Sequence, residues 1–273
     1  MREPNFSESQ LQQAVNAAFI RHVFEVRGEW AFANIPSLCA EYDLGWDTAF
    51  YFRWLPHPPV DEHEGCNFFI QYKLSGLLTS AGAKQWEFWR SEYFRFKIPH
   101  STQNDSGEYI DDYHQWDRLK ELANKNYPTF YATNDTLSKS DIKTKSDNGS
   151  LLGSIPILDV RHVNDKHKFV TFTNESDHFL LHSEKEEVNK VDFSRVIERL
   201  FDEPMLSMTD SNNKILSLLE RMAKDDEMWN QDLSKIVETN VPYVLRPWVM
   251  RSKISWFVRK HIGVDMLWMP KNG

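Results

Sequence analysis

The N-terminal third of the chain alternates between a helical pattern and two short, strongly apolar segments. Ser7 and Gln10 match a capping box, and apolar residues then recur at helical spacing, which predicts a helix over about Ser7–Val23. Asp47–Trp54 (DTAFYFRW) is short and aromatic, as strands are, and the proline-rich sequence after it cannot continue a strand. Cys66–Leu74 (CNFFIQYKL) is apolar on both faces except at two positions, which indicates a central strand covered on two sides.

The middle of the chain predicts a further helix and several strands. The pattern is helical over Asp112–Ala123, and Thr129–Ala132 reads as a strand after a Tyr-Pro break. Ser138–Ser154 is rich in Lys, Asp and Ser, so we expect a mobile surface loop there. Val160–His162 and Phe169–Thr173 are candidate strands joined by a turn.

Beyond about Val191 the pattern becomes helical through FSRVIERLF and ILSLLERMA to the end. The order of elements predicts an α/β fold with a helical C-terminal extension. We therefore divide the chain into a core over residues 1–190 and a helical region over residues 191–273. At 273 residues and 41% hydrophobic content, the chain can bury one large core with a smaller appendage.

Cysteine content and net charge limit the cellular compartments and the modes of nucleic-acid binding that we expect for the protein. Cys39 and Cys66 cannot make a disulfide framework, and the N-terminus lacks the apolar region of a signal peptide. No segment approaches the roughly 20 apolar residues that span a bilayer, so we expect a cytoplasmic protein without a membrane partner. The net charge of −8 argues against broad adhesion to nucleic acid, but an acidic metal site with a local basic groove is compatible with it.

Polar residues interrupt the two apolar segments in a pattern that suggests phosphodiester chemistry. Glu41 lies six residues before Asp47, which opens its predicted strand. Gln71 and Lys73 are two residues apart, so their side chains are expected on one face of an otherwise apolar strand. Hydrolysis of a phosphodiester needs oxygen ligands for Mg²⁺ and a cation near the attacking water. In this hypothesis Asp47 and Gln71 bind the metal, Glu41 is a further ligand or general base, and Lys73 orients or acidifies the water.

GWDTAFYF together with FFIQYKL resembles the PD-(D/E)XK nuclease superfamily, in the variants that have a Q-x-K motif. The resemblance covers roughly residues 7–180 and includes the spacing of Glu41 and Asp47. It implies a restriction-endonuclease-like mixed central β-sheet flanked by helices, cleavage of DNA or less often RNA, and Mg²⁺ or Mn²⁺ as cofactor. It also implies an N-terminal helix that can carry another acidic ligand. Here that helix has Gln13 and Asn16, with Glu8 and Glu25 as the nearby acidic residues, so this ligand is unassigned.

Other residues have alternative interpretations that the sequence leaves open. Asp47 can cap a strand, Glu41 can be solvated, and Lys73 can extend out of an edge strand. His57, His63 and Cys66 could bind Zn²⁺, but they lack paired ligand spacing.

Two further groups could contact a nucleic acid. Gln115 lies on the helix predicted to face the sheet, and is either a substrate contact or a helix-surface residue. Near the C-terminus basic residues alternate with aromatic ones, and such a stretch could bind phosphates and stack on bases, or form a core helix with a solvated face. Its basic residues of interest are Arg251, Lys253, Arg259 and Lys260.

Two functional hypotheses follow. The first is a metal-dependent nuclease acting on nucleic acid, with DNA expected as substrate and bacterial or phage defence as a setting by analogy. The second is a catalytically inactive interaction module of the same fold that binds a protein partner or a second copy through the aromatic C-terminal helices. A P-loop, a dinucleotide-binding glycine motif and a nucleophile elbow are absent from the sequence, which excludes the corresponding enzyme classes.

Overall fold

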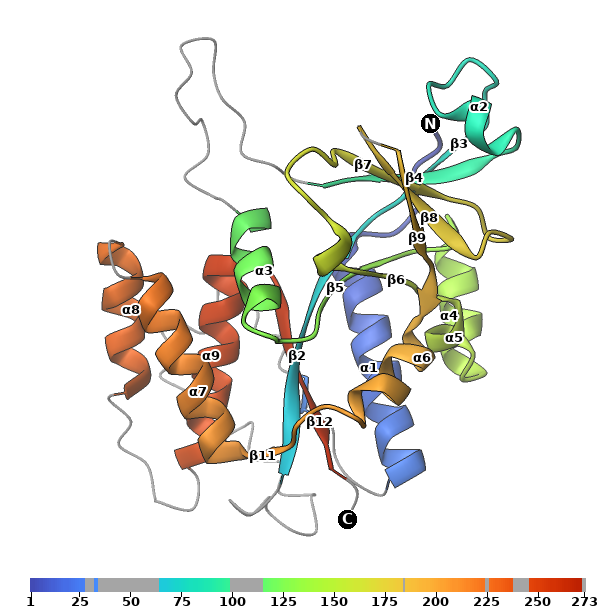
Figure 1. Ribbon diagram of the computed structural model, residues 1–273. Coiled ribbons are helices and arrows are strands. Elements are labelled where there is room, and N and C mark those ends of the chain that lie inside the picture. Colours follow the sequence, from blue (N-terminus) through green and yellow to red (C-terminus); the bar gives the residue numbers. More distant parts are fainter. Residues whose placement is uncertain are drawn as a thin grey trace, which may run out of the picture.

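The computed structural model describes residues 1–27, 32–33, 64–98, 115–183, 185–223, 226–237 and 246–271. Within these ranges the fold is α/β, with a mixed central sheet flanked by helices (Figure 1). The described part of this sheet has seven strands, in the order β1-β12-β2-β5-β6-β10 with β11 also paired to β2. They are β1 (Phe32–Ala33), β2 (Glu64–Lys73), β5 (Thr129–Thr133), β6 (Pro156–Asp159), β10 (Val191–Asp192), β11 (Leu206–Ser207) and β12 (Asp265–Pro270).

The strand β2 is the centre of this sheet. It pairs with β5 in parallel, and with β12 and β11 in antiparallel orientation. Its burial alternates between two cores: Phe68 and Ile70 belong to one hydrophobic cluster, and Phe69 between them belongs to the other. This two-sided burial confirms the central strand predicted for Cys66–Leu74.

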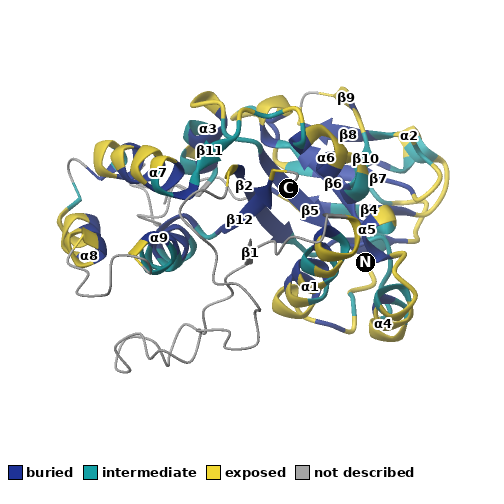
Figure 2. Cartoon of the chain, turned by 90° about the horizontal axis from the view of Figure 1, so that it is seen from below, coloured by how far each residue is buried: buried dark blue, intermediate teal, exposed yellow. Residues whose placement is uncertain are grey.

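Helices cover both faces of the central sheet (Figure 2). The face of Phe68 packs against α1 (Glu8–Arg27), α4 (Lys139–Asp147), α5 (Leu151–Ser154) and α6 (Phe193–Leu200). The face of Phe69 packs against α3 (Gln115–Asn124), α7 (Met208–Met222), α8 (Glu227–Val237) and α9 (Arg246–Ile262). None of the described helices combines the length and the apolar character needed to cross a lipid bilayer.

A second, antiparallel sheet extends the core on the Phe69 side. Its described strands are β3 (Gly76–Leu78), β4 (Tyr93–Lys97), β7 (Phe169–Phe172), β8 (His178–His182) and β9 (Glu186–Asn189), and a short helix α2 (Trp86–Trp89) connects β3 and β4. Phe94 and Phe172 stack between neighbouring strands with ring centroids 5.3 Å apart. The sequence predicted only the strand that becomes β7.

Several predicted elements are confirmed. The capping box at the start of α1 forms, with the Ser7 backbone N–H donating to Gln10 Oε1 at 3.0 Å and the Gln10 N–H donating to Ser7 Oγ at 3.2 Å. The predicted helix and strand at Asp112–Ala123 and Thr129–Ala132 correspond to α3 and β5. The helical pattern predicted from about Val191 to the end is confirmed in part: α6, α7, α8 and α9 lie there, but so do the strands β10, β11 and β12, and β12 follows the last helix.

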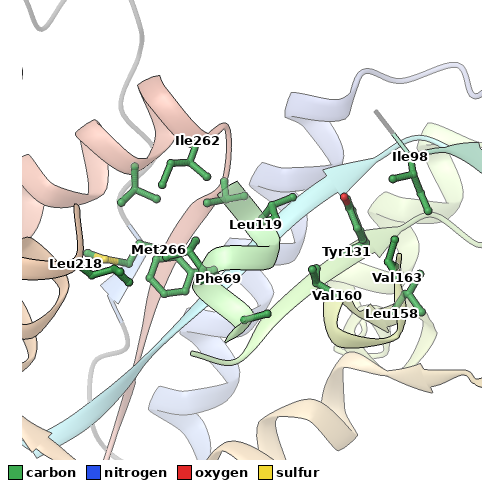
Figure 3. Packing of buried hydrophobic residues seen from close by; sticks show 14 of the residues in the cluster. Phe69, Ile98, Leu119, Tyr131, Leu158, Val160, Val163, Leu218, Ile262 and Met266 are labelled. Atoms are coloured by element: carbon green, nitrogen blue, oxygen red, sulfur yellow. The ribbon is translucent and has the colours of Figure 1, made fainter. Parts of the chain in front are cut away.

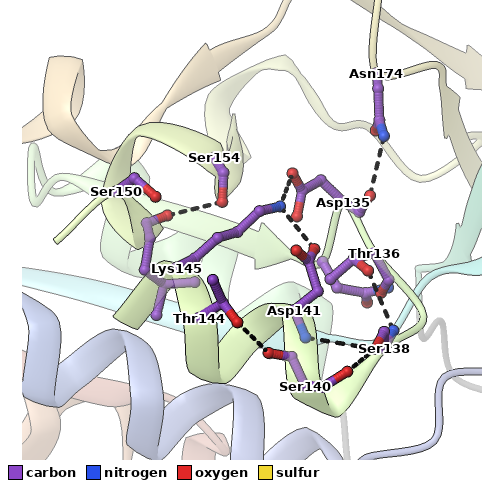
Figure 4. A network of polar contacts seen from close by, with 12 residues as sticks. Asp135, Thr136, Ser138, Ser140, Asp141, Thr144, Lys145, Ser150, Ser154 and Asn174 are labelled. Atoms are coloured by element: carbon purple, nitrogen blue, oxygen red, sulfur yellow. Dashed lines mark hydrogen bonds and ion pairs between the residues drawn. The ribbon is translucent and has the colours of Figure 1, made fainter. Parts of the chain in front are cut away.

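The surface loop predicted at Ser138–Ser154 is wrong, because this segment forms α4 and α5. Ser138 caps α4 by accepting from the Asp141 N–H, and Lys145 pairs with Asp135 at 2.7 Å and with Asp141 at 3.1 Å (Figure 4). The polar residues occupy the exposed side of these helices, and a few apolar positions such as Ile142 are buried. The high average polarity of the segment suggested a loop, although its few apolar residues form the buried face of short helices.

The strand predicted at Val160–His162 is also wrong. The strand in this region is β6, which ends at Asp159, and the next residues form a 3₁₀ turn. Asp159 starts that turn by accepting a hydrogen bond from the Arg161 N–H at 2.9 Å. Val160 is buried in the turn, so its apolar side chain indicated the core correctly but not the backbone conformation.

The region after residue 190 contributes to the central sheet as well as forming helices. The strands β10, β11 and β12 all belong to it, and β12 pairs with β2 along six residues, from Asp265 opposite Ile70 to Pro270 opposite Gly65.

A buried histidine in the second sheet is expected to make the stability of the fold depend on pH. The His182 ring Nε2 lies 2.9 Å from Thr171 Oγ1, and burial, assisted by the nearby His167, Lys185 and Arg95, lowers the pKa of His182 to about 4. The unfolded imidazole titrates near about 6.5, so the stabilisation is fully present above that pH. We expect it to be lost as the pH falls from there to about 4, by up to about 3 kcal/mol.

Urea unfolding of the wild type and of His182→Gln at about pH 7 and about pH 4.5 measures this effect, because the variant lacks the titrating ring. The variant should lose less stability between the two pH values than the wild type. Equal losses in the two proteins would show that His182 does not carry the acid sensitivity.

Candidate active site

Gln71 and Lys73 lie at the end of β2, beside β5. The register pairs Gln71 with Tyr131 and Lys73 with Thr133 without interruption. Because side chains alternate along a strand, Gln71 and Lys73 share the face of Phe69, as the sequence predicts. The strand β12 pairs with β2 only as far as Ile70, so both residues lie just beyond the end of that pairing.

The amide of Gln71 is buried without a complete set of hydrogen bonds. Its side chain is 2% exposed, and no residue in the described ranges makes a hydrogen bond to its Oε1. A buried polar atom without a partner costs about 1–3 kcal/mol, so this oxygen is a candidate for a contact with a ligand or water. A neutral amide oxygen is among the ligands that Mg²⁺ and Mn²⁺ accept, so the donor chemistry of Gln71 fits a divalent cation.

The ammonium of Lys73 is half-buried and electrostatically coupled to the first helix. Burial lowers the pKa of Lys73, and the carboxylate of Glu8 acts in the opposite direction. Partial loss of water raises the pKa of Glu8, which Lys73 and Arg259 oppose and Asp265 reinforces. Glu8 is therefore the acidic residue of α1 that is electrostatically coupled to Lys73. Glu25 instead forms an ion pair with Arg21 at 2.8 Å.

A buried polar network joins the N-terminal helix to the last strand next to these residues. Asp265 is 2% exposed and accepts hydrogen bonds from Gln12 at 2.6 Å, from Asn16 at 2.7 Å and from Arg259 at 2.7 Å. Asn16 in turn accepts from the Tyr72 hydroxyl at 2.8 Å. Burial raises the pKa of Asp265, and these donors oppose that shift. The network fixes α1 against β2 and β12.

The sequence did not predict this network. Asn16 stood out only as a polar residue where an acidic one was expected, and Asp265 lies some 250 residues further along the chain. Helical spacing of Gln12 and Asn16 places them on one face of α1, which is the one signal that local sequence carried.

Glu41 and Asp47 lie outside the described residues, so only two of the four predicted site residues have a described position. Within the described ranges, no three His, Cys, Asp or Glu side chains converge as metal ligands do. A metal site at Gln71 would consequently need carboxylates from elsewhere in the chain, and Glu41 and Asp47 are the ones that the sequence nominates.

The alternative of a zinc site concerns His57, His63 and Cys66. His57 and His63 lie outside the described residues, and Cys66 is buried with its Sγ 3.7 Å from the Leu200 carbonyl oxygen. Burial raises the pKa of Cys66 to about 12. Zinc binds the thiolate, so a raised thiol pKa increases the free-energy cost of releasing the Cys66 proton to a metal.

The C-terminal basic residues make contacts inside the protein. Arg251 is fully buried, donates to Asn67 Oδ1 at 2.6 Å and stacks over Trp268 at 4.6 Å. Lys253 donates to the Lys235 carbonyl oxygen at 2.6 Å, Lys260 pairs with Asp232 at 2.5 Å, and Arg259 pairs with Asp265. These contacts favour the interpretation of this stretch as a core helix with a solvated face over the interpretation as a nucleic-acid-binding surface. The side chain of Gln115 lies outside the described part of the chain, although its backbone begins α3.

Comparisons with protein-family models, with curated proteins and with solved structures found no match to this chain.

Removing the carboxylate of Asp265 is expected to destabilise the fold strongly. In Asp265→Ala the buried donors of Arg259, Gln12 and Asn16 lose their acceptor, and breaking a buried charge pair from one side typically costs about 3–5 kcal/mol. Urea unfolding gives the change in the free energy of unfolding. Asp147→Ala is the control, because Asp147 pairs with Lys143 on the exposed side of α4 and such pairs contribute about 1 kcal/mol or less. Equal losses in the two variants would contradict the importance of the network.

Proposed function

We propose that this chain is a metal-dependent nuclease with a restriction-endonuclease-like core, which hydrolyses phosphodiester bonds of nucleic acid, with DNA as the expected substrate. The observation that supports it most directly is the buried Gln71 amide oxygen, which has no hydrogen-bond partner in the described ranges and lies two residues from the desolvated Lys73. An amide oxygen and an ammonium on one face of a central strand supply a metal ligand and a water-orienting cation.

Each residue of the proposed site has a distinct role. Asp47, Gln71 and Glu41 would hold Mg²⁺ or Mn²⁺, which when bound polarises the phosphate and lowers the pKa of water. Lys73 would orient the attacking water or lower its pKa, and Glu41, if it does not bind the metal, would accept the proton of that water as general base. The restriction-endonuclease-like order is compatible with α1, β2, α3 and then β5 parallel to β2.

Glu8 is the residue we assign to the acidic position of the N-terminal helix. Its carboxylate is coupled to Lys73, and its position at the start of α1 leaves it exposed. A carboxylate that is accessible to solvent and electrostatically coupled to the Lys73 ammonium can ligate a hydrated cation.

Replacing Lys73 tests the chemistry. Lys73→Ala should lower the rate of cleavage of plasmid, linear and single-stranded DNA by at least about 100-fold with Mg²⁺ or Mn²⁺, because the ammonium would orient the water and lower its pKa. Lys120→Ala is a matched control, since Lys120 is also partly buried with a lowered pKa but donates to backbone carbonyls of Arg161 and Val163. Cleavage by the wild type no faster than by Lys73→Ala would refute the nuclease function.

Metal titration separates the nuclease from an inactive interaction module. Gln71→Leu removes a buried amide and should leave stability without metal unchanged or higher, because an unsatisfied polar atom is lost. The same change should weaken Mn²⁺ binding, measured by isothermal titration calorimetry, by at least about 10-fold, because a direct ligand is removed. Gln85→Leu serves as control, since Gln85 Oε1 accepts from the Tyr93 hydroxyl at 3.3 Å in the second sheet. Absence of Mn²⁺ binding by the wild type would favour the inactive module.

A further inference from the structure

The outer face of the second sheet combines aromatic rings with cations. The register pairs Lys97 of β4 with Phe169 of β7, and Phe169 with His182 of β8, so these side chains share one face of the sheet. The guanidinium of Arg95 lies over the ring of Phe169, 5.1 Å from its centroid. The opposite face of the sheet packs into the hydrophobic cluster that also contains Tyr131 (Figure 3). The outer face is therefore the one that can meet a partner.

The helix α2 continues the alternation of rings and cations. Phe88 packs on His182 with ring centroids 5.6 Å apart, and Lys185 Nζ lies 5.1 Å from the centroid of the Phe88 ring. Phe88 is 39% exposed, and Phe169 is partly exposed. Exposed apolar side chains that gather in one place mark interaction sites. We call this surface the aromatic-cation strip, and it consists of Lys97, Arg95, Phe169, Phe88 and Lys185.

Most of the positive charge of the strip is not neutralised by the protein. Among the described residues, no carboxylate forms an ion pair with Arg95 or Lys97, and the Arg95 guanidinium donates to the neutral Gln85 Oε1 at 3.4 Å. Lys185 differs, because its Nζ lies 3.5 Å from a carboxylate oxygen of Glu187. The whole chain has a net charge of −8, so a surface with three cations is a local feature. Its charge is complementary to that of an anionic partner.

Single-stranded DNA has the chemistry that complements both parts of the strip. Phosphates pair with lysine and arginine, and unpaired bases stack on aromatic side chains, and proteins that bind single strands combine the two contacts. A duplex offers the same phosphates but keeps its bases stacked on one another, and an acidic peptide has no bases to stack. The exposed rings between the cations therefore favour a single strand over both of these partners.

We propose that the aromatic-cation strip binds single-stranded DNA, with phosphates on Arg95 and Lys97 and bases on the two phenylalanine rings. The choice of DNA over RNA rests on the nuclease function proposed above. The strip itself belongs to the second sheet and α2, and it contains no residue of the candidate active site. Its binding needs no divalent cation, because its own side chains supply the positive charge.

Fluorescence anisotropy of a labelled strand of about 15 thymidines tests the proposal, because a strand of this length covers a binding site of ordinary size. EDTA is present, so that the measurement depends neither on a metal nor on cleavage. Phe169→Leu keeps an apolar side chain but removes the ring, and should weaken binding by at least about 5-fold. Lys97→Gln should weaken binding and reduce the slope of log K against log salt by about 0.7, as one lost phosphate contact does.

Phe24→Leu and Lys143→Gln are the matched controls. Phe24 is 44% exposed on α1, and Lys143 pairs with Asp147 on α4, so both lie on helices that cover the Phe68 face of the central sheet. Both variants should bind the strand as the wild type does. Urea unfolding checks the stability of every variant. If Phe169→Leu is destabilised, Phe88→Leu makes the same test of stacking at an exposed position.

Several results would overturn the binding surface. They are no binding of the strand by the wild type, equal binding of a duplex of the same length, and equal affinities of the phenylalanine variants of the strip and of Phe24→Leu. Displacement of the strand by polyglutamate as readily as by unlabelled DNA would also overturn it, because charge alone would then explain binding. Tighter binding of an RNA strand of the same length would overturn the choice of DNA.

The measurement also separates this proposal from the nuclease function. If the strand binds as expected in EDTA but the wild type cleaves no DNA with Mg²⁺ or Mn²⁺, the nuclease proposal fails and the binding surface stands. If the wild type cleaves DNA but the variants of the strip bind as the controls do, the binding surface fails and the nuclease proposal stands.

Discussion

The burial of β2 on both faces is the constraint on which the rest of the structure depends. Phe68 and Phe69 point into different hydrophobic clusters, so helices on one side and helices with a second sheet on the other must cover the same strand. A strand in this position tolerates polar side chains only where a partner satisfies them. The side chain of Asn67 has such partners: its Nδ2 donates to Ser211 Oγ at 2.8 Å, and its Oδ1 accepts from Arg251 at 2.6 Å. The Oε1 of Gln71 does not meet it within the described residues, which is why this amide stands out.

The polar network around Asp265 determines what surrounds the end of β2. It brings together the first helix, through Gln12 and Asn16, and the last helix and strand, through Arg259 and Asp265. Glu8 is electrostatically coupled both to Lys73 and to Arg259 and Asp265 of this network. The electrostatics of the candidate site therefore depend on segments from both ends of the chain, and the C-terminal region is part of the same folded sheet rather than only a helical appendage.

Errors in the prediction from sequence arose where average composition was used in place of position. In Ser138–Ser154 the many polar residues suggested a loop, although the cap at Ser138 and the buried Ile142 define a short helix. The second sheet was largely missed because its strands are short and each buries only part of its side chains. The C-terminal basic stretch likewise gave no sign that Arg251 would be fully buried against Trp268, since a guanidinium in a core is rare.

The sequence by itself determined the elements whose signal is local: the capped first helix, the apolar central strand with Gln71 and Lys73 on one face, and the helices after Val191. These follow from periodicity and capping, which act over a few residues. Only the tertiary structure decided that β12 lies beside β2, that Glu8 is coupled to Lys73, and that Tyr131 is the neighbour of Gln71. Such relations join residues distant in the chain, and no local pattern encodes which distant strands pair or how far apart two charges come to lie.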